Sequence, residues 1–134
     1  MFLIQFDACD RKLLNLSSIG YVLYYDNVVL CKHYSLINDK VPDNNYAEYT
    51  ALIKALEFAL SYKIKDIFIE GDAKTVIEQL NNNCNVNCDH IRPLYNKVIK
   101  LKQKFDYINF EHIYRKKNTM ADSLANQALY NYFK

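Results

Sequence analysis

The chain has 134 residues, of which 51% are hydrophobic and 14% aromatic, and its formal net charge at pH 7 is +2. This length predicts a single domain over residues 1–134 with its own core, and it excludes two domains. No apolar run is long enough to span a membrane, and the apolar residues before Asp7 are too few for a secretory signal. We therefore expect a globular intracellular protein, cytoplasmic or nuclear and without a membrane partner, that acts as a monomer. The weak positive charge gives slight support for a polyanionic partner.

The first third of the chain predicts three strands in succession. They cover residues 2–6, 19–25 and 28–34. The first of them is expected to end at Asp7, and residues 8–17 are polar and predict an irregular connection. Asp26-Asn27 predicts a two-residue hairpin turn. Strands that follow one another without a helix favour an antiparallel meander.

A helix is predicted over residues 44–62. Pro42 ends what precedes it, and Asp43, Asn44 and Asn45 are all candidates for the N-cap. Apolar residues follow at helical spacing and form one buried face. Glu48 is expected in the first turn, close to that face, where a carboxylate also suits the helix dipole.

The second half of the chain alternates strands and helices. The predicted elements are a strand at 66–70, helices at 73–81 and 90–105, a strand at 108–114 and a helix at 119–133. The run at 66–70 is apolar at three consecutive positions and is expected to be central and parallel to a neighbour. The order βββ-α-β-α-α-β-α predicts an α/β fold with a mixed sheet and helices on its faces.

Four carboxylates occupy the ends of these predicted elements. Asp7 and Asp72 end strands, while Glu48 and Asp122 lie in or near the first turns of helices. Strand ends and adjacent helix starts form the sites of such sheets, and acids gathered there repel one another unless a cation lies between them. Oxygen ligands favour Mg²⁺ or Mn²⁺ over zinc. For any one acid, capping or solvation is the commoner role, and only the joint pattern favours a metal site.

Short motifs in the same order carry a family resemblance. They are Phe6-Asp7, Gly20-Tyr21-Val22, Asn44-Asn45-Tyr46-Ala47-Glu48-Tyr49, Glu70-Gly71-Asp72, and Arg115-x-x-Asn118-x-x-Ala121-Asp122-x-Leu124-Ala125. Each motif alone is weak, but together their order and spacing resemble the type 1 ribonuclease H family over nearly the whole chain.

The resemblance implies a ribonuclease H-like fold, with a five-stranded mixed sheet flanked by helices on both faces. It also implies a metal-binding and catalytic quartet, namely Asp7, Glu48, Asp72 and Asp122. Such enzymes bind two Mg²⁺ and cut the RNA strand of an RNA–DNA hybrid, leaving a 3′-hydroxyl and a 5′-phosphate. Asn44 and Asn45 match the family's pair that contacts the hybrid backbone and RNA 2′-hydroxyls. A role in helix capping alone stays open for this pair.

The chain also departs from the family pattern. Ala8 replaces a Gly at a nucleic-acid-binding position, which alters how closely the backbone approaches the nucleic acid there. The catalytic His of bacterial members is absent, and Arg115 stands in that region, as in plant-like and archaeal-like branches. Arg115 is our candidate for a catalytic contact to the phosphate or for product release. Lys116 and Lys117 are expected to bind the nucleic acid, and Asn118 to cap the last helix.

Two other functions remain open at this stage. One is the same fold acting on another phosphodiester, such as double-stranded RNA or an exonuclease target. The other is a non-catalytic hybrid-binding module, against which the presence of all four acids argues. Cys84-x-x-x-Cys88 followed by Asp89-His90 resembles half a zinc site, but without a second ligand pair it predicts a loop with free thiols. His33, His90 and His112 show no metal-ligand spacing and are expected to be structural.

Overall fold

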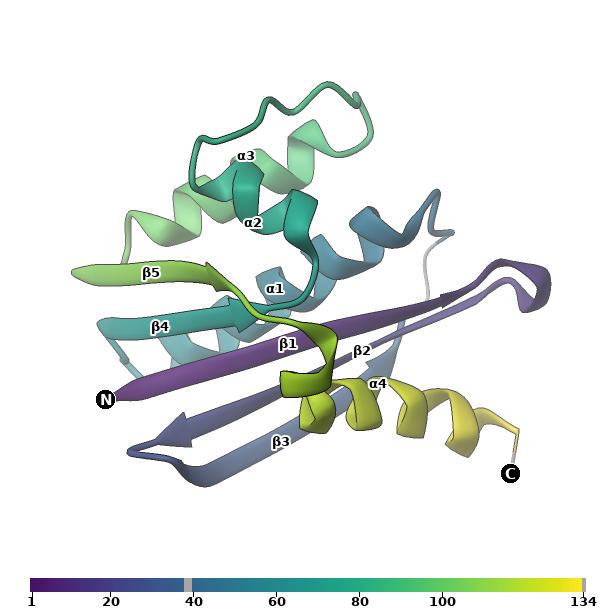
Figure 1. Ribbon diagram of the computed structural model, residues 1–134, viewed down its shortest axis with the longest axis horizontal. Coiled ribbons are helices and arrows are strands. Elements are labelled where there is room, and N and C mark those ends of the chain that lie inside the picture. The colour runs from purple at the N-terminus through teal and green to yellow at the C-terminus, as the bar shows by residue number, and fades with distance from the viewer. Residues whose placement is uncertain (38–39, 134) are drawn as a thin grey trace.

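The computed structural model describes residues 1–37 and 40–133. Five strands form one sheet in the order β3-β2-β1-β4-β5, shown in Figure 1. They are β1 (Phe2–Arg11), β2 (Leu16–Tyr25), β3 (Val28–Leu36), β4 (Asp66–Gly71) and β5 (Tyr107–His112). The first three strands are antiparallel, whereas β4 pairs in parallel with both β1 and β5. The predicted five-stranded mixed sheet is confirmed.

Helices cover both faces of this sheet. They are α1 (Asn44–Ser61), α2 (Lys74–Leu80), α3 (Arg92–Lys102) and α4 (Thr119–Tyr132), with 3₁₀ turns η1 (Lys12–Leu14) and η2 (Arg115–Lys117). Successive residues of a strand point to opposite faces. Tyr21 of β2 packs against Phe58 of α1, with ring centroids 5.8 Å apart, while the preceding Gly20 lies against α4. The helices α1 and α4 therefore lie on opposite faces. None of the described helices is both long and apolar enough to cross a membrane.

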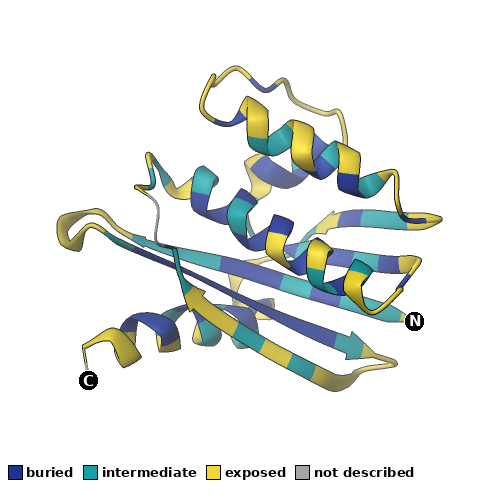
Figure 2. Ribbon diagram, turned by 180° about the vertical axis from the view of Figure 1, so that it is seen from behind, coloured by how far each residue is buried: buried dark blue, intermediate teal, exposed yellow. Residues whose placement is uncertain are grey.

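The main core lies between α1 and the sheet. Tyr49, Leu52 and Leu56 of α1 are fully buried and belong to the same apolar cluster as Ile4 and Phe6 of β1. The alternation of dark and light segments along α1 in Figure 2 shows its buried face turned toward the sheet. This packing anchors the helix that carries Glu48 against the strand that carries Asp7.

Two close backbone approaches require glycine. A Cβ at Gly20 would lie 2.7 Å from the carbonyl oxygen of Ala121 and 2.7 Å from the nitrogen of Ala125, so β2 and α4 touch backbone to backbone. A Cβ at Gly71 would lie 2.5 Å from the ring of Phe6. Both contacts lie next to positions that carry acids, since Ala121 precedes Asp122 and Gly71 precedes Asp72.

The prediction that the first strand ends at Asp7 is wrong. β1 continues to Arg11, and Asp7 lies within it, opposite Gly20. The polar residues 8–17, predicted to be irregular, belong to a long hairpin of β1 and β2. Polar side chains are tolerated there because they bond one another, as Ser17 does when it donates to Asp10 over 2.9 Å. Asn15 closes the hairpin tip with a φ of 52°, a conformation that asparagine tolerates.

The other predicted elements are present with shifted ends. The turn at Asp26-Asn27 is confirmed, and both residues have positive φ, at 49° and 69°, as a type I′ hairpin turn requires. The helix predicted from residue 90 begins at Arg92, with a proline in its first turn. Glu48 was expected in the first turn of α1, but that turn contains no acid. Because α1 begins at Asn44, Glu48 lies in the second turn, where helix packing buries it.

Candidate active site

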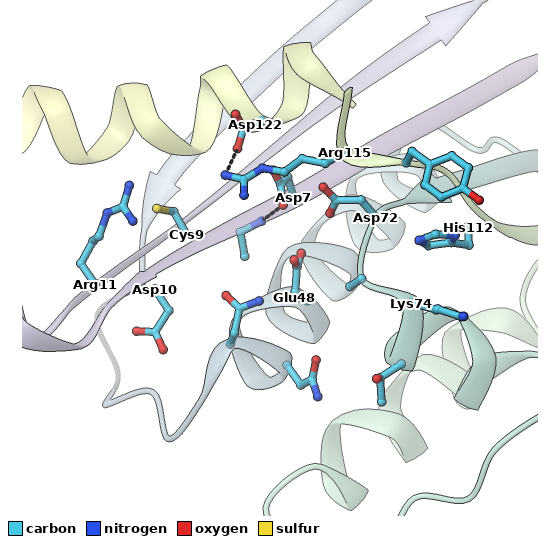
Figure 3. Close-up of a pocket in the computed structure, with 16 residues that line it drawn as sticks. Asp7, Cys9, Asp10, Arg11, Glu48, Asp72, Lys74, His112, Arg115 and Asp122 are labelled. Atoms are coloured by element: carbon cyan, nitrogen blue, oxygen red, sulfur yellow. Dashed lines mark hydrogen bonds and ion pairs between the residues drawn. The ribbon is translucent and has the colours of Figure 1, made fainter. Parts of the chain in front are cut away.

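Three carboxylates from three different elements meet at one point. Asp7 comes from the middle of β1, Glu48 from α1, and Asp72 from the residue after β4. One carboxylate oxygen from each lies within 4.8 Å of the others, as Figure 3 illustrates. Asp7 is 4% exposed and Glu48 is 3% exposed. Their elements meet because β1 pairs in parallel with β4 and α1 packs on β1.

The fourth predicted acid lies beside this group with a cation. Asp122 is in the first turn of α4, and its Oδ1 lies 3.7 Å from Nη2 of Arg115. In Figure 3 the guanidinium of Arg115 lies between Asp122 and the other acids. The structure thus brings the predicted quartet together as a tight group of three with Asp122 as an adjacent, ion-paired fourth.

Burial and mutual repulsion raise the pKa values of these acids. Burial, followed by the charge of Asp72, raises the pKa of Asp7 to about 7, although the N–H of Ala8 donates to its Oδ1 over 2.9 Å. Burial raises the pKa of Glu48 well above its ordinary value, and the charge of Asp7 adds to this. Burial also raises the pKa of Asp72 despite the opposing charge of Arg115. Three acids that are buried close together are stabilised by protonation or by a bound cation.

The geometry of the cluster suits a divalent cation. Oε1 of Glu48 is buried and has no hydrogen-bond partner among the described residues. A buried carboxylate oxygen without a donor is costly, and the two nearest acids are acceptors when ionised. A hard cation would satisfy this oxygen and offset the repulsion. All three ligands offer oxygen, which is the donor set of Mg²⁺ and Mn²⁺.

The acids line a cavity of about 550 Å³. Most of the residues predicted to form the site lie on its wall, namely Asp7, Ala8, Asn44, Asn45, Glu48, Asp72, Arg115 and Asp122. Lys116 and Lys117 are exposed in η2 and are not part of this wall. Their predicted contact with nucleic acid would therefore lie outside the cavity, and it stays a prediction.

Several cavity residues escaped the sequence reasoning. Cys9, Asp10 and Arg11 line the cavity because β1 continues past Asp7. His112 was expected to be structural, but it also lines the cavity, at the end of β5. It is placed there because it pairs with Gly71, the residue before Asp72. The alternating pattern of the last strand, followed to its end, is the signal that would have located it.

Of the two predicted caps, the one on α1 is confirmed for Asp43 and the one on α4 is wrong. The N-cap of α1 is Asp43, whose Oδ1 accepts a hydrogen bond of 2.9 Å from the N–H of Tyr46. Asn44 and Asn45 are therefore not the caps of α1. Asn118 occupies the N-cap position of α4 but makes no side-chain cap. Its Nδ2 donates to the carbonyl oxygen of Phe6, and in this orientation its Oδ1 has no partner among the described residues.

The segment that resembles half a zinc site carries free thiols. Cys84 and Cys88 are free and exposed, in agreement with the prediction of free thiols. Among the described residues, the group of three or more close potential ligands is the one formed by the acids. His90 lies instead 2.6 Å from Asp43.

Comparison with known proteins agrees with this arrangement. A family described as reverse transcriptase-like matches residues 5–128. Ribonuclease HI of Halobacterium salinarum is 34% identical over 125 residues, which are 92% of this chain and 62% of that protein. A bifunctional protein of Mycobacterium tuberculosis is 36% identical over 86 residues, 64% of this chain and 24% of its own length. The chain thus spans less than two thirds of these curated relatives.

Solved structures give the same result. The crystal structure of the Halobacterium salinarum RNase H1 superposes with a TM-score of 0.89 at 32% identity, and covers 97% of this chain and 98% of that one. LC11-RNase H1, solved in complex with an RNA/DNA hybrid, superposes with a TM-score of 0.90 at 25% identity over the whole of both chains. The chain therefore belongs to the reverse transcriptase-like family, and its resemblance to type 1 ribonuclease H is confirmed.

Proposed function

We propose that the protein is an endonuclease that cuts the RNA strand of RNA–DNA hybrids with the help of divalent cations. The observation that carries this proposal is the close group formed by buried Asp7 and Glu48 with half-buried Asp72, in the wall of a cavity, where one Glu48 oxygen has no partner among the described residues. The hybrid bound to LC11-RNase H1 supports this choice of substrate.

Asp7, Glu48, Asp72 and Asp122 would hold the cations. We propose two Mg²⁺, with Mn²⁺ as a possible substitute, because the ligand atoms are carboxylate oxygens. When bound, such a pair activates a water and stabilises the leaving oxygen of an in-line displacement at phosphorus. The buried carboxylates contribute fixed negative charge that is ready to receive the metals. Asp122 would leave Arg115 to do so, which frees the guanidinium for the substrate.

Asn44 and Asn45 would select the RNA strand. Both residues line the cavity at the start of α1, within two turns of Glu48. A carboxamide has both donors and an acceptor, so each side chain can bond a 2′-hydroxyl, which DNA lacks. Because the pair lies on the helix that also carries Glu48, an RNA strand bound there is brought to the acids.

Arg115 would contact the phosphate. Its guanidinium lines the cavity beside Asp122, and its planar fork can bind two phosphate oxygens at once. Lys116 and Lys117 lie outside the cavity wall and would add affinity that does not depend on sequence. Ala8, whose N–H bonds Asp7, would form the floor on which the backbone of the nucleic acid lies.

A panel of end-labelled duplexes tests the function. Hybrid, double-stranded RNA and double-stranded DNA are incubated with Mg²⁺ or Mn²⁺, and an otherwise identical hybrid with chemically blocked ends separates internal cleavage from exonuclease action. We expect internal cuts in the RNA strand of both hybrids and none in the other duplexes. Asp7→Asn should be inactive, and Asp66→Asn, an exposed acid at the start of β4, should be fully active. Cutting of double-stranded RNA as fast as hybrid, or binding of hybrid without cutting, would contradict the proposal.

A further inference from the structure

Asp43 uses both of its carboxylate oxygens to join two parts of the chain. Oδ1 accepts the N–H of Tyr46 over 2.9 Å and so caps α1. Oδ2 lies 2.6 Å from Nε2 of His90, which is 47 residues further along the chain. Burial opposes the negative charge, but these two contacts together lower the pKa of Asp43. The bond between Asp43 and His90 is therefore charge-assisted.

His90 is presented by a loop that is itself held in place. The loop connects α2 to α3, and it buries Val86 and Ile91 at 8% and 3% exposure. The guanidinium of Arg92 donates to the carbonyl oxygen of Val86, which ties the loop to the start of α3. His90 thus stands on an anchored segment, so that its contact fixes the position of Asp43.

The capped turn carries the residues that face the substrate. Asn44 and Asn45 follow Asp43 directly and line the acid cavity, whereas His90 does not line it. A rotation of the first turn of α1 would move both carboxamides, while Glu48, buried in the second turn, is held by the core. The contact to Asp43 is therefore placed to affect substrate binding and to leave the acids unmoved.

We propose that His90 is a positioning residue for hybrid binding. Through the carboxylate of Asp43 it fixes the first turn of α1, and thereby the direction in which Asn44 and Asn45 meet the RNA strand. This inference rests on the proposed function of the site. It assigns to the loop between α2 and α3 a role in substrate recognition that involves no contact with the substrate.

Kinetics of three variants and the wild type on the hybrid test this inference. Glutamine places its amide nitrogen near the position of Nε2 of a histidine, whereas asparagine is too short to reach Asp43. His90→Asn should raise KM about fivefold with kcat within about twofold, since an exposed ion pair contributes only modest free energy. His90→Gln should restore KM. Lys97→Ala is the matched control, because Lys97 lies 3.5 Å from Glu57 and also joins α3 to α1, but far from the first turn.

A second measurement separates positioning from general loosening. Amide hydrogen exchange at Tyr46, whose N–H bonds Asp43, should become faster in His90→Asn and stay unchanged in His90→Gln and Lys97→Ala. Equal KM values in His90→Asn and wild type would overturn the inference and leave the proposed function intact. An equal rise of KM in His90→Asn and Lys97→Ala would mean that both act through general stability, and it would also overturn the inference. A wild-type protein that does not cut hybrid would overturn both.

Discussion

The side-chain Nδ2 of Asn118 donates a buried hydrogen bond of 2.8 Å to the carbonyl oxygen of Phe6, 112 residues earlier in the chain. The acceptor belongs to the residue before Asp7, and the donor stands at the start of the helix that carries Asp122. One amide thus links the strand and the helix that bring two of the proposed metal ligands to the site.

Loss of this link should destabilise the protein. Asn118→Ala would leave the buried carbonyl of Phe6 without its donor, at a cost of about 1–3 kcal/mol in the free energy of unfolding. Urea denaturation measures the difference. Asn131→Ala removes an exposed carboxamide from the same helix, where it bonds Tyr34, and should change stability by no more than about 0.5 kcal/mol. Equal losses in the two variants would contradict a special role for Asn118.

Removal of one charge from the acid cluster should stabilise the metal-free protein. Asp7→Asn relieves repulsion with Glu48 and Asp72 and changes little volume, so its melting temperature in a chelator should exceed that of the wild type. In saturating Mg²⁺ the order should reverse, because the cation binds the wild-type cluster and raises its stability. Melting temperatures of both proteins in chelator and over a series of Mg²⁺ concentrations provide the measurement. A wild-type melting temperature that does not change with Mg²⁺ would contradict the metal site.

The metal-free wild type should also lose stability as the pH rises. Burial and neighbouring charge raise the pKa of Asp7 from 3.8 to about 7, so the folded state retains a proton that the unfolded chain has already released. The stabilisation is complete below about pH 4, declines above it, and is lost as the pH passes through 7. Unfolding free energies in chelator between pH 4 and 8 check the sign. Asp7→Asn should flatten the curve, and a wild-type curve that rises over this range would refute the argument.

Asn45→Ala should impair recognition of RNA more than it impairs folding. Asp43 caps α1, so Asn45 is not needed for the cap, and its substitution should change stability by no more than about 0.5 kcal/mol. Affinity for the hybrid should fall, while affinity for a DNA duplex of the same sequence, which has no 2′-hydroxyl, should stay unchanged. Binding titrations of the two duplexes at fixed salt measure this. A parallel loss for both duplexes would remove the proposed contact to the 2′-hydroxyl.

Arg115→Lys should lower turnover more than binding. Lysine keeps the charge but lacks the planar fork, so kcat at saturating hybrid should fall while KM changes little. The double variant Lys116→Ala with Lys117→Ala is the comparison, because these side chains lie outside the cavity wall. It should keep kcat, raise KM, and reduce the salt dependence by about one unit of slope for each lost phosphate contact. Equal kcat in Arg115→Lys and wild type would show that Arg115 is surface charge.

Much of the fold was predictable because its elements follow hydrophobic periodicity. The face of α1 that contains Leu52 and Leu56 was expected from spacing alone, and the hairpin at Asp26-Asn27 from turn chemistry. The second half of β1 was not predictable in this way. Its polar residues are satisfied by partners such as Ser17, whose pairing with Asp10 depends on the strand register.

The candidate site shows the same division. The acids were located because order and spacing along the chain are sequence properties. The partner of Asn118 was not predictable, since its acceptor is a main-chain carbonyl that only tertiary packing brings near. The same holds for His90, whose contact with Asp43 joins two loops. Local propensity favoured a cap for Asn118, but its side chain instead pairs with the buried carbonyl of Phe6, which needs a donor.

The contact of Gly20 with α4 determines which side of the site can adapt to a substrate. Where main chain meets main chain, no rotamer can turn to absorb a displacement, so we expect α4 to keep its position on β2. Asp122 and Asn118 therefore belong to the stationary half of the site. The opposite half, at the first turn of α1, is held by the contact between the partly exposed side chains of Asp43 and His90, and a contact between side chains opens more easily than two packed main chains separate. We expect that any movement that admits a duplex occurs at the first turn of α1, while α4 keeps its position.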